Sequence, residues 1–254
     1  MLDQTGGETP FDIERFRQFM PEKADVRENK IVGFDARDRR ARAFSLMRTS
    51  LSKRLKERGH RIVGLTSATP AAGKSFLSMN LAASLSKVMD DPVYLVDLDL
   101  RRASMGEQIG LNVDAGIASY LGGASMDLHD LGYRIHGTKL VVFPTERVTN
   151  NSAELVSGAR FERFIEAVSA RSGSSTVLID LPPAFASDDT MLIMERLDSY
   201  ILVVDSGKTT KRHVNELVGL LDPVPCVGTI LNRYIGGFGD SYGYGYGDYN
   251  KYYD

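Results

Sequence analysis

Short apolar runs alternate with amphipathic segments along most of the chain. Six runs rich in Val, Ile and Leu predict β-strands: 61–67, 92–100, 139–144, 175–183, 200–205 and 225–232. Between several of them lie segments with apolar residues at helical spacing, including 73–89 and 152–170. Strands that are apolar throughout and separated by helices are typical of a parallel sheet covered on both faces. We therefore predict an α/β, doubly wound fold.

The residues before the first strand form two segments that differ in charge. Residues 1–36 are polar and mixed in charge, and they predict an N-terminal arm with a short helix at 11–20. Residues 37–61 carry ten Lys or Arg against two acidic residues, a net charge of +8. Within this basic segment apolar residues recur at spacings of three and four and predict an amphipathic helix: Phe44, Met47, Leu51 and Leu55.

The last 13 residues, YGYGYGDYNKYYD, hold six of the 11 tyrosines: Tyr242, Tyr244, Tyr246, Tyr249, Tyr252 and Tyr253. Alternating glycine makes this backbone costly to order and leaves no apolar pattern to bury. We therefore place a single folded domain at 37–235 and a disordered tail at 236–254. Composition alone leaves two interpretations of the tail open: a sticky disordered end, or a string of hydroxyls presented to a kinase.

The bulk composition indicates a cytoplasmic protein. Its 254 residues are 43% apolar and 25% charged, and the net charge of −2 creates no global field that would favour nucleic acid. The single cysteine, Cys226, lies in an apolar run, so we interpret it as a buried hydrophobe. No run reaches the length of a membrane span, and the N-terminus does not resemble a secretion signal. We expect any membrane association to come through a partner or a surface patch.

The first predicted strand leads into a phosphate-binding pattern. Residues 68–75 read ATPAAGKS, which is the spacing G-x-x-x-x-G-K-[ST] with alanine at the first position, and a predicted helix follows. Backbone N–H groups of such a loop and helix N-terminus bind phosphate oxygens, the lysine reaches the β- and γ-phosphates, and the serine can ligate Mg²⁺. The predicted nucleotide site consists of Ala68, Thr69, Pro70, Ala71, Ala72, Gly73, Lys74, Ser75 and Phe76.

Two further strands end in carboxylates. Asp97 and Asp99 are two residues apart and so lie on one face of their strand, and Asp180 ends another strand. Because ligands bind at the carboxyl ends of parallel strands, we expect the three acids to converge with the phosphate loop. The alternative is that Asp97 and Asp99 only form a turn, which is the interpretation that we favour for Asp205.

In its order of motifs the chain resembles the bacterial tyrosine kinases of capsule and exopolysaccharide synthesis, which have a P-loop fold of the MinD/ParA type. Besides the phosphate loop and the terminal tyrosines, the resemblance rests on LVDLDLRR, NNSAELVSGARF, VLIDLPP, LVVDSGKTTKR and GTILNRY, and it covers roughly residues 40–235 plus the tail. It implies an ATP-dependent protein-tyrosine autokinase that phosphorylates its own tail, on a neighbouring subunit, and regulates polysaccharide polymerisation and export.

The resemblance also implies roles for single residues. The catalytic residues would be Lys74, Asp97, Asp99 and Asp180. Among them Asp97 would accept the proton of the incoming tyrosine hydroxyl or orient it. Mg²⁺ would be held by Ser75, Asp99 and Asp180, directly or through water. Asn232 would contact the adenine, and the six tail tyrosines would be the phosphoacceptors.

The partners implied by the resemblance are a membrane-spanning chain-length regulator that activates the kinase and a cognate tyrosine phosphatase. The kinase would thereby be placed at the inner face of the plasma membrane. The family pairs subunits in a ring through a Glu-x-x-Arg-x-x-Arg pattern, at whose positions this chain carries Arg42, Ser45 and Arg48. Because like charges in contact are unfavourable, we predict a monomer or weak oligomer in the absence of nucleotide and activator.

Two other functions stay open. One is a non-kinase ATPase switch or scaffold recruited to a membrane partner. The partitioning ATPases of related fold carry a lysine at the position of Thr69, so its absence here argues against their lysine-dependent dimer. The other is a nucleic-acid-binding ATPase, which only the basic segment 37–61 supports, and we favour an interface or an anionic membrane for that segment. A further departure from the family is Leu181. Residues 180–183 read DLPP here, whereas the family commonly has DTPP, so leucine replaces the threonine.

Overall fold

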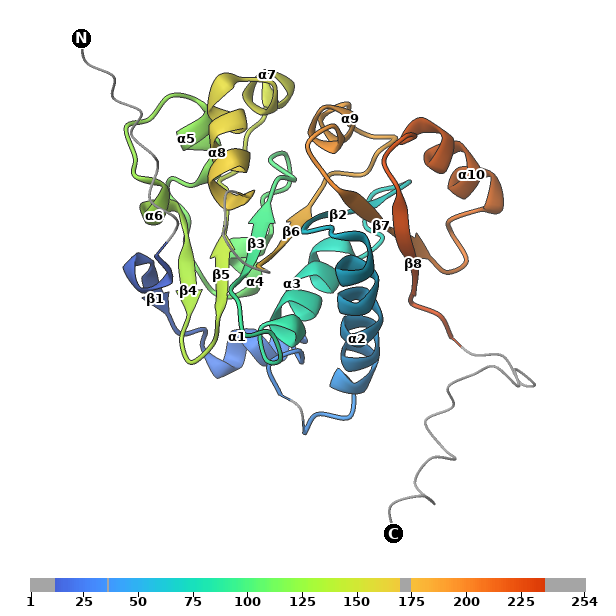
Figure 1. Ribbon diagram of the computed structural model, residues 1–254, viewed down its shortest axis with the longest axis horizontal. Helices are drawn as coiled ribbons and strands as arrows, with labels where there is room; N and C mark the ends of the chain where they lie inside the picture. Colours follow the sequence, from blue (N-terminus) through green and yellow to red (C-terminus); the bar gives the residue numbers. More distant parts are fainter. Residues whose placement is uncertain (1–11, 36, 170–174, 236–254) are drawn as a thin grey trace.

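An eight-stranded sheet forms the centre of the molecule (Figure 1). The computed structural model describes residues 12–35, 37–169 and 175–235. In spatial order the strands are β1 (Arg17–Phe19), β4 (Tyr133–Ile135), β5 (Leu140–Phe143), β3 (Val93–Asp97), β6 (Thr176–Asp180), β2 (Ile62–Ser67), β7 (Ser199–Asp205) and β8 (Cys226–Asn232). All neighbouring strands are parallel except β4 and β5, which confirms the predicted α/β fold.

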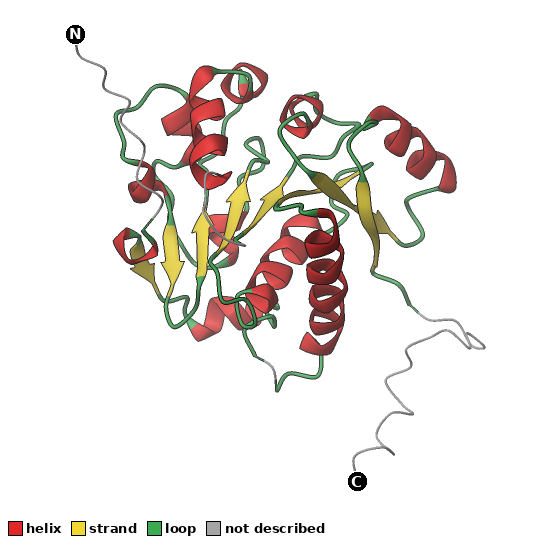
Figure 2. Ribbon diagram, viewed as in Figure 1, coloured by secondary structure: helices red, strands yellow, loops and turns green. Residues whose placement is uncertain are grey.

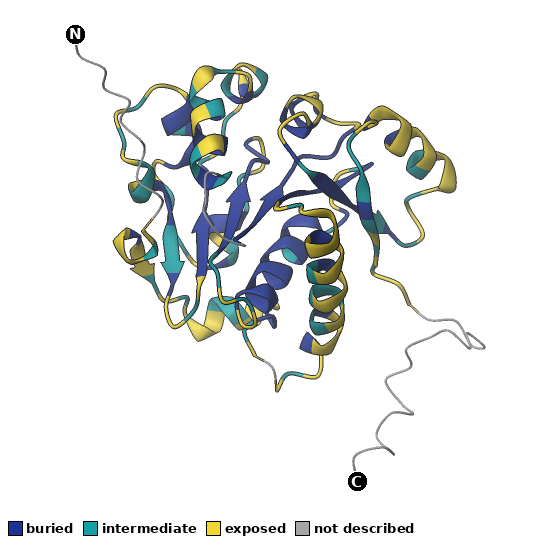
Figure 3. Ribbon diagram, viewed as in Figure 1, coloured by how far each residue is buried: buried dark blue, intermediate teal, exposed yellow. Residues whose placement is uncertain are grey.

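Helices cover both faces of this sheet (Figure 2). One face packs against α1 (Lys23–Glu28), α2 (Ala41–Arg58), α3 (Lys74–Leu85) and α4 (Met105–Gln108). The other packs against α5 (Ile117–Leu121), α6 (Leu128–Leu131), α7 (Ser152–Val156), α8 (Ala159–Ser169), α9 (Asp189–Met194) and α10 (Lys211–Leu220). Successive strand residues point to opposite faces and so enter two separate buried clusters. The central strands β2, β3, β5, β6 and β7, together with α3, are the most deeply buried part of the described chain (Figure 3).

The predicted elements of the central fold are present. All six apolar runs form strands, from β2 to β8 with the exception of β4. The basic segment forms α2, whose predicted stripe faces the core: Phe44, Leu51 and Leu55 are buried and Met47 is half-buried against them. The amphipathic segment at 152–170 is not one helix, because α7 and α8 are separate.

The N-terminal segment differs from its prediction. In place of a short helix at 11–20 it contains a 3₁₀ turn, Ile13–Arg15, followed by β1, which pairs with β4. Phe16 is 2% exposed and its ring contacts those of Tyr94 and Phe143, while a Cβ atom at Gly132 would lie 2.7 Å from the Phe16 ring. The burial of this aromatic side chain explains why residues 12–35 pack on the sheet and do not form a separate arm.

The side chain of Asn80, in the middle of α3, forms hydrogen bonds with the backbone of the segment that precedes α2. Its side-chain oxygen accepts hydrogen bonds from the backbone N–H groups of Val32 and Gly33, at 2.7 and 2.9 Å. Its amide nitrogen donates to the carbonyl of Phe76 at 3.0 Å. The Asn80 side chain is completely buried, so no water replaces these bonds if it is removed.

Asn80→Ala is therefore expected to lower the free energy of unfolding by about 2–4 kcal/mol, since two buried N–H donors lose their acceptor. Urea denaturation measures this value. Asn215→Ala is the matched control, because it makes the same change in helix propensity at an exposed position of α10. The control should change stability by less than about 0.5 kcal/mol. Equal effects of the two substitutions would show that Asn80 is not a structural clamp.

Candidate active site

The phosphate loop connects the carboxyl end of β2 to the first residue of α3. Two of its residues have a left-handed backbone, Ala71 with φ +58° and Gly73 with φ +93°. Such turns direct successive N–H groups into one concave surface that suits an anion. A Cβ atom at residue 73 would lie 2.2 Å from the side-chain nitrogen of Asn232, so this position requires glycine. Ala71 holds the same backbone region at a cost of about 1–2 kcal/mol.

Lys74 points from the start of α3 toward the carboxylates and not into the apolar core. It is 4% exposed, and its ammonium nitrogen lies 3.9 Å from a carboxylate oxygen of Asp99. The structure thus brings together the two residues that the sequence predicted to share the phosphate and metal site. A buried lysine needs such an anionic partner, or the phosphates of a nucleotide, to remain charged.

The three predicted carboxylates meet at the carboxyl ends of β3 and β6. Asp97 and Asp180 are register partners on these two neighbouring strands, and all three acids are at most 5% exposed. Asp97 is oriented by two backbone N–H groups, those of Asp99 at 3.2 Å and Met105 at 3.1 Å. In contrast, neither carboxylate oxygen of Asp180 has a hydrogen-bond partner among the described residues.

This arrangement fits Mg²⁺ better than an ion that is held by protein alone. Among the described residues, no group of three or more His, Cys, Asp or Glu side chains is placed to coordinate one metal. Mg²⁺ usually takes one or two carboxylates and completes its shell with water and substrate phosphates. The orphaned oxygens of Asp180 suit such a hydrated ion, and the Ser75 hydroxyl lies close enough to Asp180 to favour its charged form.

The clustering raises the pKa of all three carboxyl groups. Burial is the largest cause in each case. For Asp97 the repulsion by Asp180 and Asp99 adds to it and places the pKa well above the ordinary range. For Asp99 the neighbouring Lys74 opposes the burial. For Asp180 the same lysine and the Ser75 hydroxyl limit the rise, and the pKa is about 6.

Asp180→Asn is expected to raise the free energy of unfolding of the nucleotide-free protein near pH 7.5. Folding raises the pKa of Asp180 from 3.8 to about 6, so the folded state binds the proton more tightly than the unfolded state does. The cost of the ionised carboxylate is therefore fully present above pH 6 and disappears as the pH falls toward 3.8. Thermal unfolding near pH 7.5 and pH 5 should show an advantage of the asparagine variant that shrinks at the lower pH.

The matched control for this comparison is Asp188→Asn, an exposed acid at the N-terminus of α9 that makes no side-chain capping bond. It should change the unfolding temperature little at either pH. An Asp180→Asn protein that is less stable than the parent near pH 7.5 would contradict the prediction. In that case the Asp180 carboxylate would be compensated by the Ser75 and Ser78 hydroxyls.

Asn232 ends β8 beside the phosphate loop. Its side-chain nitrogen donates a hydrogen bond to the carbonyl of Ala72 at 2.8 Å, so it supports the loop backbone. The next residue, Arg233, donates to the buried carboxylate of Asp205 at 2.8 Å, and the Lys208 ammonium lies 3.5 Å from the same oxygen. Asp205 is a turn residue as predicted, because its carbonyl accepts bonds from the next turn, but the ion pair was not foreseen. Contact of Asn232 with adenine stays a prediction.

Asp189, the first residue of α9, is a fully buried acid that none of the recognised patterns singled out. One of its oxygens accepts a hydrogen bond from the Ser152 hydroxyl at 3.2 Å, and the other lies 4.0 Å from the Nε atom of Arg101. Arg101 Nε in turn donates to the Ser152 hydroxyl oxygen at 3.1 Å. Asp189 is also near enough to Asp99 to raise its pKa. The only signal in the sequence was that Arg101 and Ser152 lie within the motifs LVDLDLRR and NNSAELVSGARF.

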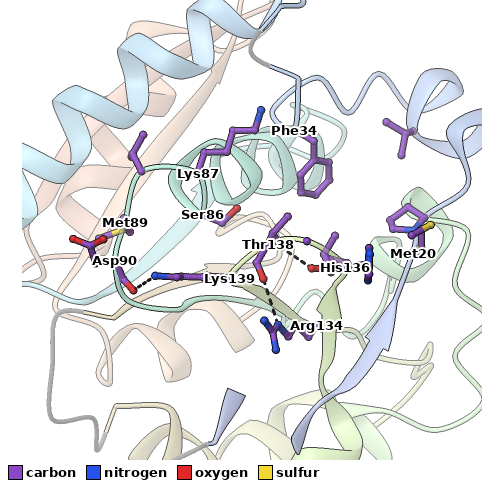
Figure 4. Close-up of a pocket in the computed structure, with 15 residues that line it drawn as sticks. Met20, Phe34, Ser86, Lys87, Met89, Asp90, Arg134, His136, Thr138 and Lys139 are labelled. Carbon is purple, nitrogen blue, oxygen red and sulfur yellow. Dashed lines mark hydrogen bonds between the residues drawn. The ribbon is translucent and has the colours of Figure 1, made fainter. Parts of the chain in front are cut away.

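A cavity of about 940 Å³ lies far from these residues (Figure 4). Residues 86–90, which follow the C-terminus of α3, and the β4–β5 turn at 136–139 line it. The phosphate loop is at the other end of α3, a helix of 12 residues and so about 18 Å long. No predicted site residue lines this cavity, in which Lys139 donates to the carbonyl of Asp90. It is therefore separate from the candidate active site.

The six tail tyrosines lie outside the described residues, so their role as phosphoacceptors stays a prediction. Within the part of the chain that the structure describes, no helix combines the length and the apolar character that crossing a bilayer requires.

Comparison with known proteins gives a consistent group of relatives, although no family model matches the chain. It is 28% identical over 214 residues to the tyrosine-protein kinase CpsD of Streptococcus agalactiae, covering 82% of this chain and 89% of that protein. It is 29% identical over 213 residues to the putative tyrosine-protein kinase EpsB of Ralstonia solanacearum, covering 83% of this chain. The chain spans only 28% of the length of EpsB.

Among solved structures, the kinase domain of VpsO superposes with a TM-score of 0.69 at 29% sequence identity. The match covers 77% of this chain and 97% of that domain. The similarity therefore extends over nearly the whole of that kinase domain.

Proposed function

We infer that this chain is a member of the bacterial tyrosine kinases of capsule and exopolysaccharide synthesis and that it is an ATP-dependent protein-tyrosine autokinase. Its acceptors are the tyrosines of its own C-terminal segment. The observation that carries this proposal is the meeting of Lys74 with Asp97, Asp99 and Asp180 at one edge of the sheet. Such an edge would supply phosphate binding, a metal site and a proton acceptor together.

Nucleotide binding rests on the phosphate loop. Its N–H groups and the N-terminus of α3 would hold the phosphates, and Lys74 would exchange its contact with Asp99 for the β- and γ-phosphates. Ser75, Asp99 and Asp180 would hold Mg²⁺, which supplies charge neutralisation on the phosphates when bound. The raised pKa values of the acids fit a site that awaits a cation, because a bound cation removes the repulsion between them.

Asp97 has the role of proton acceptor for the tyrosine hydroxyl. Two backbone N–H groups fix the orientation of its carboxylate, which removes the need to order it during the reaction. Its raised pKa makes it a stronger base than an ordinary aspartate, which suits a hydroxyl with a pKa near 10. Phosphoryl transfer has a loose transition state, so a proton acceptor that acts late in the reaction is sufficient.

The decisive experiment is incubation of the full chain with Mg·ATP followed by phosphosite mapping. Phosphotyrosine in the C-terminal cluster, lost in Asp97→Asn and Asp99→Asn, is the expected result. Nucleotide affinity should change less in Asp97→Asn, because Asp97 acts on the hydroxyl and not on the phosphates. Release of phosphate from ATP without any phosphotyrosine would instead support the ATPase-switch alternative. The sequence does not favour this alternative, because Thr69 stands where the partitioning ATPases of related fold have a lysine.

The proposed partners follow from the same family. A membrane-spanning chain-length regulator would activate the kinase and hold it at the inner face of the plasma membrane, and a tyrosine phosphatase would reverse the modification. Adding candidate regulators to the phosphorylation assay tests the first of these, with a rise in the initial rate as the expected result.

Self-association is expected to be weak without nucleotide or activator. Arg48 of α2 donates a hydrogen bond to the carbonyl of Ser84 in the same chain at 3.1 Å, so this arginine is engaged within the molecule. Arg42, at the position where the family has glutamate, cannot accept a bidentate pair from an arginine of a second subunit. Light scattering of the unphosphorylated protein at micromolar concentration should give the mass of a monomer. A stable ring under these conditions would contradict the expectation.

A further inference from the structure

Three arginines follow β3 and β5, the two strands that lie beyond β6 when counted from β2 and the phosphate loop. The order across the sheet is β5, β3, β6 and β2. The phosphate loop follows β2, the carboxylates end β6 and β3, and Arg147 follows β5. Arg101 and Arg102 come directly after the carboxylates of β3, and Arg147 donates a hydrogen bond to the carbonyl of Arg101 at 3.1 Å. We call Arg101, Arg102 and Arg147 the arginine rim.

The rim lies where the acceptor must enter. In phosphoryl transfer the attacking and leaving oxygens are roughly in line, so the acceptor approaches the γ-phosphate from the side opposite ADP. A nucleotide held by the phosphate loop would lie on the β2 side, and the tyrosine would then arrive past the ends of β3 and β5. In Figure 1 the ends of β3 and β6 point toward the space between α7 and α9, the two helices that hold Arg101.

Arg101 is the member of the rim that is positioned by buried groups. Its Nε atom is bound to Ser152 of α7 and lies 4.0 Å from Asp189 of α9. Asp189 is fully buried, and its second oxygen accepts no hydrogen bond among the described residues. Arg101 itself is 54% exposed in its side chain. Two buried partners therefore hold the base of the guanidinium group while the side chain remains accessible to a ligand.

The C-terminal sequence supplies a matching charge. Tyr249 follows Asp248 and Tyr253 precedes Asp254, whereas Tyr244 and Tyr246 lie between glycines. A guanidinium group forms two parallel hydrogen bonds with a carboxylate, which gives both affinity and fixed geometry. An aspartate next to the acceptor would thus place the tyrosine ring beside Asp97.

We propose that Arg101, positioned by Ser152 and Asp189, binds the carboxylate of an aspartate adjacent to the acceptor tyrosine and thereby makes Tyr249 and Tyr253 the preferred acceptors. This inference rests on the proposed kinase function and adds its substrate class, which is tyrosine next to an acidic residue. Arg101 is a specificity-determining residue, and Asp189 is a positioning residue that acts through it.

Time-resolved phosphosite mapping of the full chain with Mg·ATP tests the proposal. In the parent, Tyr249 and Tyr253 should be modified about tenfold faster than Tyr244 and Tyr246, as one charge-assisted bidentate contact allows. Arg101→Gln should abolish this difference by slowing only the two preferred sites. Asp189→Asn should also reduce the rate difference between the two preferred tyrosines and Tyr244 and Tyr246, without abolishing it. Arg163→Gln, an exposed change on α8, is the matched control and should leave the pattern as it is.

Changes in the acceptor provide the reciprocal test. Asp248→Asn should slow Tyr249 in the parent to the rate of Tyr244 and Tyr246 and have no further effect in Arg101→Gln. Combining Arg101→Glu with Asp248→Lys should restore preference for Tyr249. A peptide with the sequence GDYNKYYD should bind the nucleotide-free protein about tenfold more tightly than GNYNKYYN, and the difference should vanish in Arg101→Gln and at high salt. This binding readout does not depend on turnover or on an assembled ATP site.

The outcomes separate the two proposals. Phosphotyrosine spread evenly over the cluster in the parent, or an equal loss at every site in Arg101→Gln with unchanged folding by circular dichroism, overturns the role of Arg101 alone. Complete absence of phosphotyrosine in the parent overturns the kinase function and this inference with it.

Discussion

Replacing Lys74 by methionine is expected to lower the rate of tyrosine phosphorylation by about 10³-fold, a loss typical of removing a preorganised charge from a phosphoryl-transfer site. The substitution removes the ammonium group that lies 3.9 Å from a carboxylate oxygen of Asp99 and that, in the proposed function, binds the phosphates of ATP. It also raises the pKa of Asp99 further, since Lys74 is the neighbour that opposes the effect of burial. Methionine keeps an apolar stem of similar length, so the fold should persist. Initial rates of phosphotyrosine formation measure the effect.

The matched control is Lys87→Met, which makes the same chemical change just beyond the other end of α3. Its phosphorylation rate should equal that of the parent, and both variants should show the circular dichroism of the parent. Undiminished phosphotyrosine in Lys74→Met would show that this loop is not the active site, whatever the similarity to the kinases implies.

Deleting residues 240–254 is expected to remove nearly all phosphotyrosine and to leave ATP binding unchanged. The deletion takes away all six clustered tyrosines but none of the residues that form the phosphate loop or the carboxylate cluster. Each phosphate adds roughly −1.5 to −2 charges at neutral pH, so full modification gives the tail a large negative charge. Intact-mass spectrometry for the phosphates and a fluorescent ATP analogue for binding separate the two effects.

A second variant with the six tail tyrosines changed to phenylalanine keeps the length and charge of the segment. It should behave like the deletion, because only the hydroxyl groups are lost. If the signal persists in both proteins, the acceptors lie elsewhere, and Tyr133 of β4 and Tyr234 after β8 are the described residues to examine.

The central fold was predictable because its strands are long and apolar. β2, β3, β6 and β7 are almost entirely buried between helices, so their sequences need no polar alternation. β1 and β4 escaped prediction because each has only three residues and includes an arginine. Strands this short are defined by their partners and not by a periodic pattern.

The candidate site also contains residues that were predictable from the sequence and residues that were not. Lys74 and the three carboxylates were predictable because each follows a strand within a short motif, and parallel strands bring their carboxyl ends together. Asp189 and Asn80 could not be assigned a role from sequence, since each acquires its partners only when distant segments pack. Ser152 lies 37 residues from Asp189, and Val32 lies 48 residues from Asn80. Patterns of residues that are near in sequence cannot predict contacts at such separations.

The pairing of β1 with β4 fixes an order of events during synthesis. Arg17 is the register partner of Tyr133, a difference of 133 − 17 = 116 residues. At 5–20 residues per second, translation of this interval takes roughly 6–23 s. Throughout that time Phe16 has neither Phe143 nor the edge of β4 to pack against. β1 is therefore unable to pair until the ribosome has passed residue 133, and nascent chains halted before that residue should leave it open to protease.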